Sequence, residues 1–231
     1  MLSIVIPTLN EEKYLPLLLE SIKRQSFKDY EIVVSDAGSK DKTREIAEKY
    51  GCLVVAGGFP AAGKNRGAEA CRGELILFVD ADVILKNNSL GGFLKEFEKR
   101  NLAVATFLLN SNEKFHNFSF KILYNFPSLL TERFLPQAMN IILVKKDIHQ
   151  KIGGFNEKIK IGEELDYIRR GRKFGKFGVL KSAKILASPR RFKRDGWLKT
   201  WLKYFLCQVH MIFLGPVRSD LFKYRFNHYN E

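Results

Sequence analysis

Short apolar runs alternate with amphipathic segments through residues 1–110. Runs rich in Val, Ile, Leu and Phe are typical of buried strands, and they occupy residues 2–8, 30–36, 52–57, 74–80 and 102–110. Between them, the spacing of apolar residues predicts helices within residues 11–25, 39–51, 61–73 and 89–100. This alternation predicts an α/β fold with a mostly parallel sheet flanked by helices on both faces.

The second half of the chain is less regular. Residues 115–130 are strongly aromatic and fit one helical stripe, which Pro127 is expected to disturb near its end. From Gly196 onward the pattern predicts an aromatic amphipathic helix that breaks at Gly215-Pro216. The elements predicted between these segments are a strand and short helix within 137–155, a helix within 162–175, and two short strands at 176–180 and 183–188.

Polar or charged residues follow three of the predicted strands. They are Pro7-Thr8-Leu9-Asn10-Glu11 after the first strand, Asp36 after the second, and Asp80-Ala81-Asp82 after the fourth. In open parallel sheets, ligands bind in the crevice beyond the carboxyl ends of the strands. We therefore expect all three groups to open onto one edge of the sheet.

The pair Asp80 and Asp82 suggests a metal site. Two carboxylates crowded at a strand end repel each other and lose hydration, and a divalent cation removes both penalties. Mg²⁺ and Mn²⁺ accept a few protein carboxylates and leave positions for substrate phosphates. The alternative is that Asp80 only ends a strand and Asp82 caps a turn.

Two further groups share the predicted edge. Asp36 could accept hydrogen bonds from a base or ribose, or serve as a turn residue before Gly38. Lys64 and Arg66 lie at a predicted helix start and suit phosphate oxygens, unless they belong to a solvated basic loop. Each structural alternative is reasonable alone, but the shared position of these groups favours a binding site.

Composition narrows the class of protein. The 231 residues suffice for one core, and the start of the chain reads as a strand, not a signal peptide. Three scattered cysteines favour a cytoplasmic setting over a disulfide framework. Residues 1–110 are electrically neutral, so the net charge of +14 lies wholly in the second half, which is expected to face an anionic partner.

Three segments together resemble glycosyltransferase family 2. They are the opening "SIVIPTLNEEKYLPLLLESIKRQSFKDYEIVVSDAGSKDKT", the stretch "GKNRGAEACRGELILFVDAD" that leads to a D-x-D motif, and "GGFNEKIKIGEELDYIRR". A fourth stretch, "SPRRFKRDGWLKTWLKYF", resembles small members of the family. The resemblance implies a Rossmann-like GT-A fold and transfer of a sugar from a nucleotide-diphosphate sugar, with inversion at the anomeric carbon.

The resemblance also implies roles for particular residues. Asp82, together with Asp80, would bind Mn²⁺ or Mg²⁺, and the metal would offset charge on the departing diphosphate. Residues 1–110 would bind the nucleotide-sugar, 111–195 would supply the acceptor side and catalytic base of the same domain, and 196–231 would form a helical tail. The residues expected to contact the donor are Pro7, Thr8, Asn10 or Glu11, Asp36, Lys64, Arg66, Asp80, Ala81, Arg190 and Arg191.

The catalytic base is expected in "GEELDY". Inversion by direct displacement needs a base within hydrogen-bond reach of the acceptor hydroxyl. Aligned to the family's E-D-x-D pattern, Glu164 replaces the usual aspartate and is the preferred candidate, with Asp166 or a purely structural cap as alternatives. The Q-x-x-R-W signature of processive synthases is absent from the sequence, which favours transfer of a single sugar.

The basic, aromatic second half raises two possibilities for the acceptor and the setting. Residues 197–217 suit an amphipathic helix in a bilayer interface, which favours a peripheral enzyme at the cytoplasmic face with a lipid acceptor such as a polyprenyl phosphate. Equally, the aromatic stretches could pack on the domain or form a homodimer face, with a glycan as the acceptor.

Rival functions belong to other classes. A nucleotidyltransferase would more usually open with a Gly-rich loop, which "PTLNEE" does not supply. No nucleic-acid-binding motif accompanies the basic composition, so nucleic acid is not an expected partner. Intact Asp36, Asp80, Asp82 and Glu164 disfavour a sugar-nucleotide sensor without activity.

Overall fold

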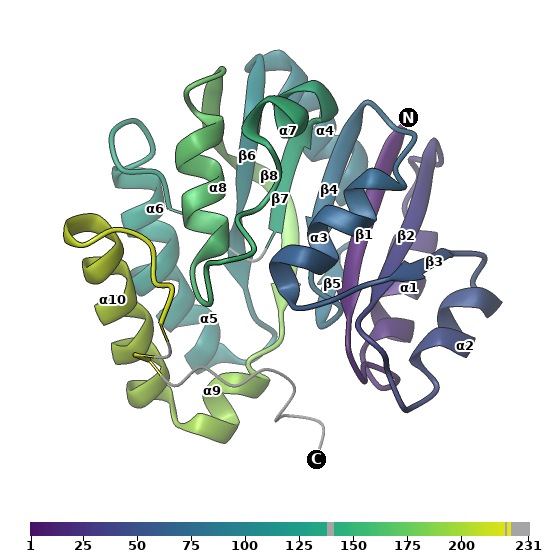
Figure 1. The fold of residues 1–231 in the computed structure, drawn as a ribbon, viewed down its shortest axis with the longest axis horizontal. Coiled ribbons are helices and arrows are strands. Elements are labelled where there is room, and N and C mark those ends of the chain that lie inside the picture. The colour runs from purple at the N-terminus through teal and green to yellow at the C-terminus, as the bar shows by residue number, and fades with distance from the viewer. Residues whose placement is uncertain (138–140, 220, 223–231) are drawn as a thin grey trace.

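One mixed sheet organises the molecule (Figure 1). The computed structural model describes residues 1–137, 141–219 and 221–222. Within these residues the sheet has eight strands in the order β3-β2-β1-β4-β7-β6-β8-β5. The strands are β1 (Leu2–Thr8), β2 (Tyr30–Asp36), β3 (Leu53–Ala56), β4 (Leu75–Val79), β5 (Val83–Leu85), β6 (Leu102–Asn110), β7 (Ile141–Lys145) and β8 (Lys176–Ala187).

Parallel pairing dominates the first half of the sheet. Strands β3, β2, β1 and β4 run parallel, so β1, β2 and β4 end on one edge, as the alternation predicts. Strand β7 is antiparallel to both β4 and β6, while β8 is parallel to β6 and antiparallel to β5. The α/β prediction is confirmed, with antiparallel pairs in the second half of the sheet.

Helices cover both faces of the sheet (Figure 1). They are α1 (Leu15–Lys23), α2 (Thr43–Lys49), α3 (Pro60–Glu69), α4 (Ser89–Lys99), α5 (Lys114–Phe120), the π-helix η1 (Lys121–Asn125), α6 (Phe126–Leu130), α7 (Lys146–Ile152), α8 (Glu163–Gly171), α9 (Arg190–Asp195) and α10 (Trp197–Phe213).

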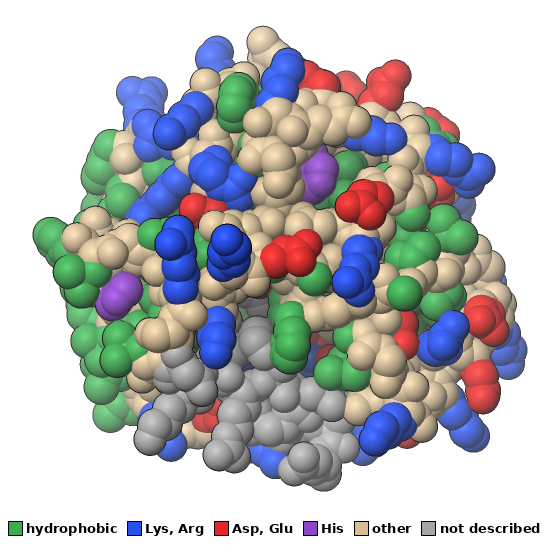
Figure 2. Space-filling view, viewed as in Figure 1, with side chains coloured by type: hydrophobic (Ala, Val, Ile, Leu, Met, Phe, Trp, Pro, Cys, Tyr) green, Lys and Arg blue, Asp and Glu red, His purple; other side chains and the backbone are tan. Residues whose placement is uncertain are grey.

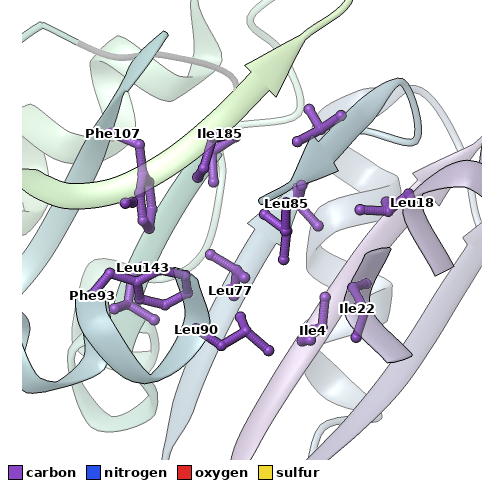
Figure 3. Close-up of a cluster of buried hydrophobic side chains, with 14 of the residues drawn as sticks. Ile4, Leu18, Ile22, Leu77, Leu85, Leu90, Phe93, Phe107, Leu143 and Ile185 are labelled. Carbon is purple, nitrogen blue, oxygen red and sulfur yellow. The ribbon is translucent and has the colours of Figure 1, made fainter. Parts of the chain in front are cut away.

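Alternating side chains of the strands divide the core into two clusters. Ile4 and Ile6 of β1 face α1, α2 and α4, in the cluster drawn in Figure 3. Val5 faces the other side, where α3, α7, α8 and α10 pack. Gly67 allows α3 to approach the sheet closely, because a Cβ there would lie 2.3 Å from Cγ1 of Val5.

Residues 176–187 form one strand, so the prediction of two short strands is wrong. The polar run in the middle suggested a break, but the chain absorbs it as a shift of register between β8 and β6. Glu96 of α4 stabilises the irregular backbone, because its carboxylate accepts hydrogen bonds from the amides of Lys181 and Ser182, at 2.9 and 2.8 Å. The short strand β5, which pairs with β8, has no clear signal in the sequence.

The helical predictions for the second half hold, with one adjustment. Pro127 lies in the first turn of α6, where a proline is tolerated, and α5, η1 and α6 follow one another without a break. The amphipathic helix α10 ends at Phe213, close to the expected break. Residues 138–140, 220 and 223–231, which include the end of the predicted tail, lie outside the described residues.

Candidate active site

A cleft of about 530 Å³ lies beside the carboxyl ends of β1 and β4. A volume of this order suits a small-molecule ligand. Four residues expected at the site lie outside its lining, namely Asn10, Asp36, Arg66 and Asp166. The other ten line it: Pro7, Thr8, Glu11, Lys64, Asp80, Ala81, Asp82, Glu164, Arg190 and Arg191.

Arg190, the first residue of α9, links two segments of the sheet edge. Its guanidinium donates to both carboxylate oxygens of Glu11, at 2.7 and 2.9 Å, and forms an ion pair with Asp82 at 2.8 Å. It also lies over the Tyr14 ring, 4.5 Å from the centroid. Burial raises the pKa of Glu11 despite this pairing. Arg190 thus brings positive charge directly to the D-x-D segment.

Asp80 carries negative charge that nearby cations do not fully offset. Burial raises the pKa of Asp80 to about 7; the Lys64 ammonium opposes this effect, and the Asp82 carboxylate adds to it. Among the described residues, none forms an ion pair with Asp80. A hard divalent cation fits these two carboxylates and would leave positions for phosphate oxygens.

The described residues contain no group of three or more His, Cys, Asp or Glu that could hold a metal ion. Asp80 and Asp82 would therefore supply only part of a coordination shell. This arrangement suits a cation that arrives with a diphosphate, because phosphate oxygens and water would complete the shell.

Lys64 lies at the centre of a buried charge cluster. Its ammonium forms ion pairs with Glu164 and, at 3.2 Å, with Glu163, and its side chain is only 2% exposed. Helix α3 supplies the lysine, and the first turn of α8 supplies both carboxylates. The Lys64 ammonium also lies 5.1 Å from the centroid of the Phe155 ring.

The two glutamates of this cluster differ in proton affinity. Burial, reinforced by the neighbouring carboxylate of Glu164, raises the pKa of Glu163 to about 7. Burial also disfavours the ionised form of Glu164, but the charge and hydrogen bond of Lys64 outweigh it and lower the pKa of Glu164. Both glutamates line the cleft, and Glu164 is the one whose ionised form Lys64 favours.

Asp166 faces a different environment. Its carboxylate forms an ion pair with Arg170 at 2.7 Å, one turn further along α8. The guanidinium of Arg170 also donates to the carbonyls of Ile152 and Gly154. These contacts tie α8 to the end of α7, and they direct Asp166 away from the cleft lining.

The polar loop after β2 is held by Asp36. One carboxylate oxygen accepts the amides of Gly38 and Ser39, at 3.0 and 2.9 Å, and the other accepts the hydroxyl of Thr8 at 3.2 Å. Asn10 joins the same loop, because its side-chain oxygen accepts the amide of Lys40 at 2.8 Å. Asp36 and Asn10 therefore hold this loop in place without lining the cleft themselves.

The predicted phosphate-binding arginines occupy different positions. Arg66 is exposed and donates to the carbonyl of Gly57, outside the cleft lining. Arg191 lines the cleft and donates to the hydroxyl of Tyr204 on α10. Only Arg190 and Arg191 of the three are thus positioned along the cleft.

Several cleft residues were not singled out from the sequence. One face of α10 lines the cleft through Tyr204, Cys207, Gln208 and Met211. Their spacing is the available signal, because these residues recur on one helical face opposite the exposed leucines. A second unforeseen group comes from η1 and its neighbours: Phe120, Leu123, Tyr124, Pro127 and Ser128.

Comparison with known proteins identifies the family. Residues 3–156 match the sequence profile described as glycosyl transferase family 2. The chain belongs to glycosyl transferase family 2. As a member of glycosyl transferase family 2, it carries the D-x-D segment within the matched region and the candidate base Glu164 beyond it.

Curated relatives in glycosyl transferase family 2 include proteins of quite different length. A PGL/p-HBAD biosynthesis glycosyltransferase of Mycobacterium bovis is 29% identical over 181 residues, which cover 72% of this chain and 68% of the relative. The poly(ribitol-phosphate) β-N-acetylglucosaminyltransferase TarS of Staphylococcus aureus is 36% identical over 98 residues, 38% of this chain and 17% of TarS. A GalNAc(5)-diNAcBac-PP-undecaprenol β-1,3-glucosyltransferase of Campylobacter jejuni is 32% identical over 104 residues, 41% of this chain and 34% of the relative.

Solved structures of other transferases share the fold. The mannosyltransferase PcManGT of Pyrobaculum calidifontis, in complex with GDP-Man and Mn²⁺, has a TM-score of 0.70 at 16% identity, covering 92% of this chain and 64% of that one. S. aureus TarS 1–349 in complex with UDP-GlcNAc has a TM-score of 0.67 at 22% identity, covering 92% of this chain and 73% of that one. The GT-A fold expected for a glycosyl transferase family 2 member is thereby confirmed.

Proposed function

We propose that the protein transfers a single sugar from a nucleotide-diphosphate sugar to a hydroxyl of a lipid-linked acceptor, with inversion and with Mn²⁺ or Mg²⁺. The main support is that Asp80, Asp82 and Glu164, which are distant in sequence, line one cleft. Family membership and nucleotide-sugar complexes of proteins with the same fold agree with this assignment.

The donor side of the proposal uses the sheet edge. Asp80 and Asp82 would hold the cation, which when bound would offset charge on the diphosphate leaving group. Arg190 and Arg191, at the same end of the cleft, would neutralise further phosphate charge. The wall built by Pro7 and Thr8 would accommodate the nucleoside.

The transfer step assigned to this chain is proton removal by Glu164. The acceptor oxygen attacks the anomeric carbon and forms the new C–O bond, while the bond from that carbon to the diphosphate oxygen breaks. The acceptor's proton passes to the Glu164 carboxylate, and the nucleoside diphosphate departs with the bonding electron pair. Lys64 keeps Glu164 ionised and therefore able to accept that proton.

The acceptor side is predominantly apolar. Leu123 and Pro127 approach the cleft from the α5–α6 side, and Cys207 and Met211 approach it from α10. This lining suits an acceptor that carries a hydrocarbon chain in addition to its reactive hydroxyl. The name of the C. jejuni relative includes an undecaprenol-linked acceptor, which is consistent with this proposal.

A paired experiment tests the two roles. Binding and transfer would be measured for a panel of UDP-GlcNAc, UDP-glucose and GDP-mannose with Mn²⁺ or Mg²⁺. Asp82→Ala should weaken metal-dependent donor binding by about tenfold or more, because a direct ligand is lost. Glu164→Gln should bind the donor normally but lose most transfer, because an amide cannot accept the proton.

Exposed carboxylates provide matched controls. Asp147→Ala and Glu48→Gln change the same residue types at the surface and should leave both measurements unaltered. Donor binding that is independent of metal in both the wild type and Asp82→Ala would contradict the metal role. Undiminished transfer by Glu164→Gln would assign the base elsewhere.

A further inference from the structure

Two helical segments expose their apolar side chains to solvent. In ordinary surface helices the apolar stripe faces the core. Here each segment buries one face and leaves large apolar residues 40–79% exposed on the other. These residues are Phe115, Phe118, Ile122, Phe126 and Leu130 of α5–α6, and Leu198, Leu202, Phe205, Leu206, Ile212 and Phe213 of α10.

The two exposed stripes belong to one surface. The rings of Phe115 and Trp197 are in edge contact, with centroids 5.6 Å apart, so the start of α5 touches the start of α10. In Figure 1 the two segments lie side by side at one end of the molecule, and Figure 2 shows hydrophobic side chains gathered along that edge. We call these residues the apolar face. Contiguous apolar surface of this kind marks an interaction site.

The charge around the apolar face indicates the kind of partner. Residues 114–131 and 196–218 contain no Asp or Glu. Their charged residues are all basic: Lys114, Lys121, Lys199, Lys203 and Arg218. A second copy of the chain docked on the same face would bring like charges together, whereas an anionic bilayer would attract them.

We propose that the apolar face binds the surface of an anionic lipid bilayer. Its aromatic and leucine side chains would enter the interface, while the lysines would contact lipid phosphates. None of the described helices combines the length and apolar character needed to cross a membrane, so the contact would be peripheral.

Bilayer contact also explains the position of the cleft. The inner faces of the same helices line it, through Tyr124 and Pro127 on one side and Tyr204 and Met211 on the other. An acceptor chain could therefore pass from the bilayer between α5–α6 and α10, so that its hydroxyl would reach Glu164. Only this last step rests on the proposed function; bilayer binding does not require it.

The test is co-sedimentation with vesicles, without donor or acceptor. Vesicles of phosphatidylcholine with phosphatidylglycerol should bind the wild-type protein at low salt, and pure phosphatidylcholine should bind it weakly. Leu202→Ser/Leu206→Ser should lower the partition coefficient by about tenfold, because two inserted side chains are lost. Leu17→Ser/Leu53→Ser changes leucines of similar exposure (52% and 48%, against 46% each) away from this face, and it should bind like the wild type.

Charge-reversal variants test the attraction between the lysines of the apolar face and anionic lipid. Lys121→Glu/Lys199→Glu should weaken binding to anionic vesicles by about tenfold or more, while Lys49→Glu/Lys95→Glu should change it little. If both double variants lost vesicle binding equally, net charge alone would explain the effect, and the apolar face would not be the binding surface. So would failure of the wild type to sediment, or a dimer seen by light scattering that Leu202→Ser/Leu206→Ser dissociates.

Transfer activity separates this proposal from the proposed function. A protein that ignores vesicles yet transfers sugar to a detergent-dispersed acceptor would overturn bilayer binding alone. A protein that binds vesicles through the apolar face but shows no transfer with any donor would overturn the proposed function alone.

Discussion

Lys64 is surrounded by more negative charge than it can neutralise. It forms ion pairs with Glu163 and Glu164, and its charge also acts on Asp80. One ammonium serves three carboxylates, and burial, reinforced by the neighbouring carboxylates, raises the pKa of Glu163 and of Asp80 to about 7. The cluster therefore depends on Lys64 for its stability as well as for the ionisation of Glu164.

Removing this lysine should destabilise the fold. Lys64→Met leaves buried carboxylates without their counter-ion, which typically costs about 3–5 kcal/mol in the free energy of unfolding. Urea denaturation would measure the loss. Lys49→Met, on the exposed end of α2, is the matched control and should stay within about 0.5 kcal/mol of the wild type.

Adding Glu163→Gln to Lys64→Met should restore part of the lost stability, because one of the stranded charges is then absent. If the free energy of unfolding of Lys64→Met lay within about 1 kcal/mol of the wild-type value, the buried cluster would not depend on Lys64 for its stability.

At the level of elements, a glycine lets the start of α8 approach α10 closely. Gly162 precedes α8 with a φ of 82° in the left-handed region. A Cβ at this position would lie 2.4 Å from Sδ of Met211 and 3.9 Å from Sγ of Cys207. At Gly162 the helix that carries both glutamates thus packs directly on the helix that carries part of the apolar face, and Arg169 adds a hydrogen bond to the carbonyl of Met211 at 3.1 Å.

Gly162→Ala should lower the free energy of unfolding by about 2–4 kcal/mol, because backbone strain and overpacking add. Gly153→Ala separates these contributions: its φ is 75°, but a Cβ there meets nothing within 4 Å. It should therefore show the strain alone, about 1 kcal/mol. In urea denaturation, Gly162→Ala combined with Met211→Ala should cost less than the sum of the two single changes; strict additivity would contradict the clash.

Local patterns were enough to predict β1, β2 and β4 and the polar residues that follow them. Parallel pairing then implied that these residues share an edge, and the structure confirms this. Sequence could not indicate that Arg190 pairs with Glu11, 179 residues earlier, because no local pattern encodes that contact. Helical spacing does group the cleft residues of α10 on one face, but sequence could not tell which face meets the cleft, since both faces are rich in apolar residues.

At the scale of the whole molecule, one buried histidine that resists protonation makes the free energy of unfolding depend on pH. His149 of α7 lies among the rings of Phe78, Phe155 and Tyr167, and its Nδ1 is 2.8 Å from the hydroxyl of Tyr167. Burial, with a smaller contribution from the charge of Arg170, lowers the pKa of His149 to about 4. The unfolded chain, in which a histidine has a pKa near 6.5, therefore binds a proton more readily than the folded chain does.

The free energy of unfolding should consequently decrease as the pH falls from about 6.5 toward 4. Above pH 6.5, His149 should contribute no pH dependence. The expected contribution of His149 is about 3 kcal/mol in the free energy of unfolding. Denaturant titrations at several pH values would measure it, with His149→Gln as the variant that cannot titrate. Profiles of equal steepness for the two proteins would show that another group controls the acid sensitivity.

Arg190 competes with a metal cation for Asp82, because its guanidinium already pairs with that carboxylate. An ion approaching Asp82 meets a guanidinium that already neutralises this carboxylate and Glu11. Under the proposed function, loading of the cleft would therefore exchange charges, with Arg190 turning from the protein carboxylates to the incoming phosphates. Because only Gly196 separates α9 from α10 along the chain, that exchange would pull on α10, and occupancy of the cleft would be mechanically coupled to the proposed contact with the bilayer.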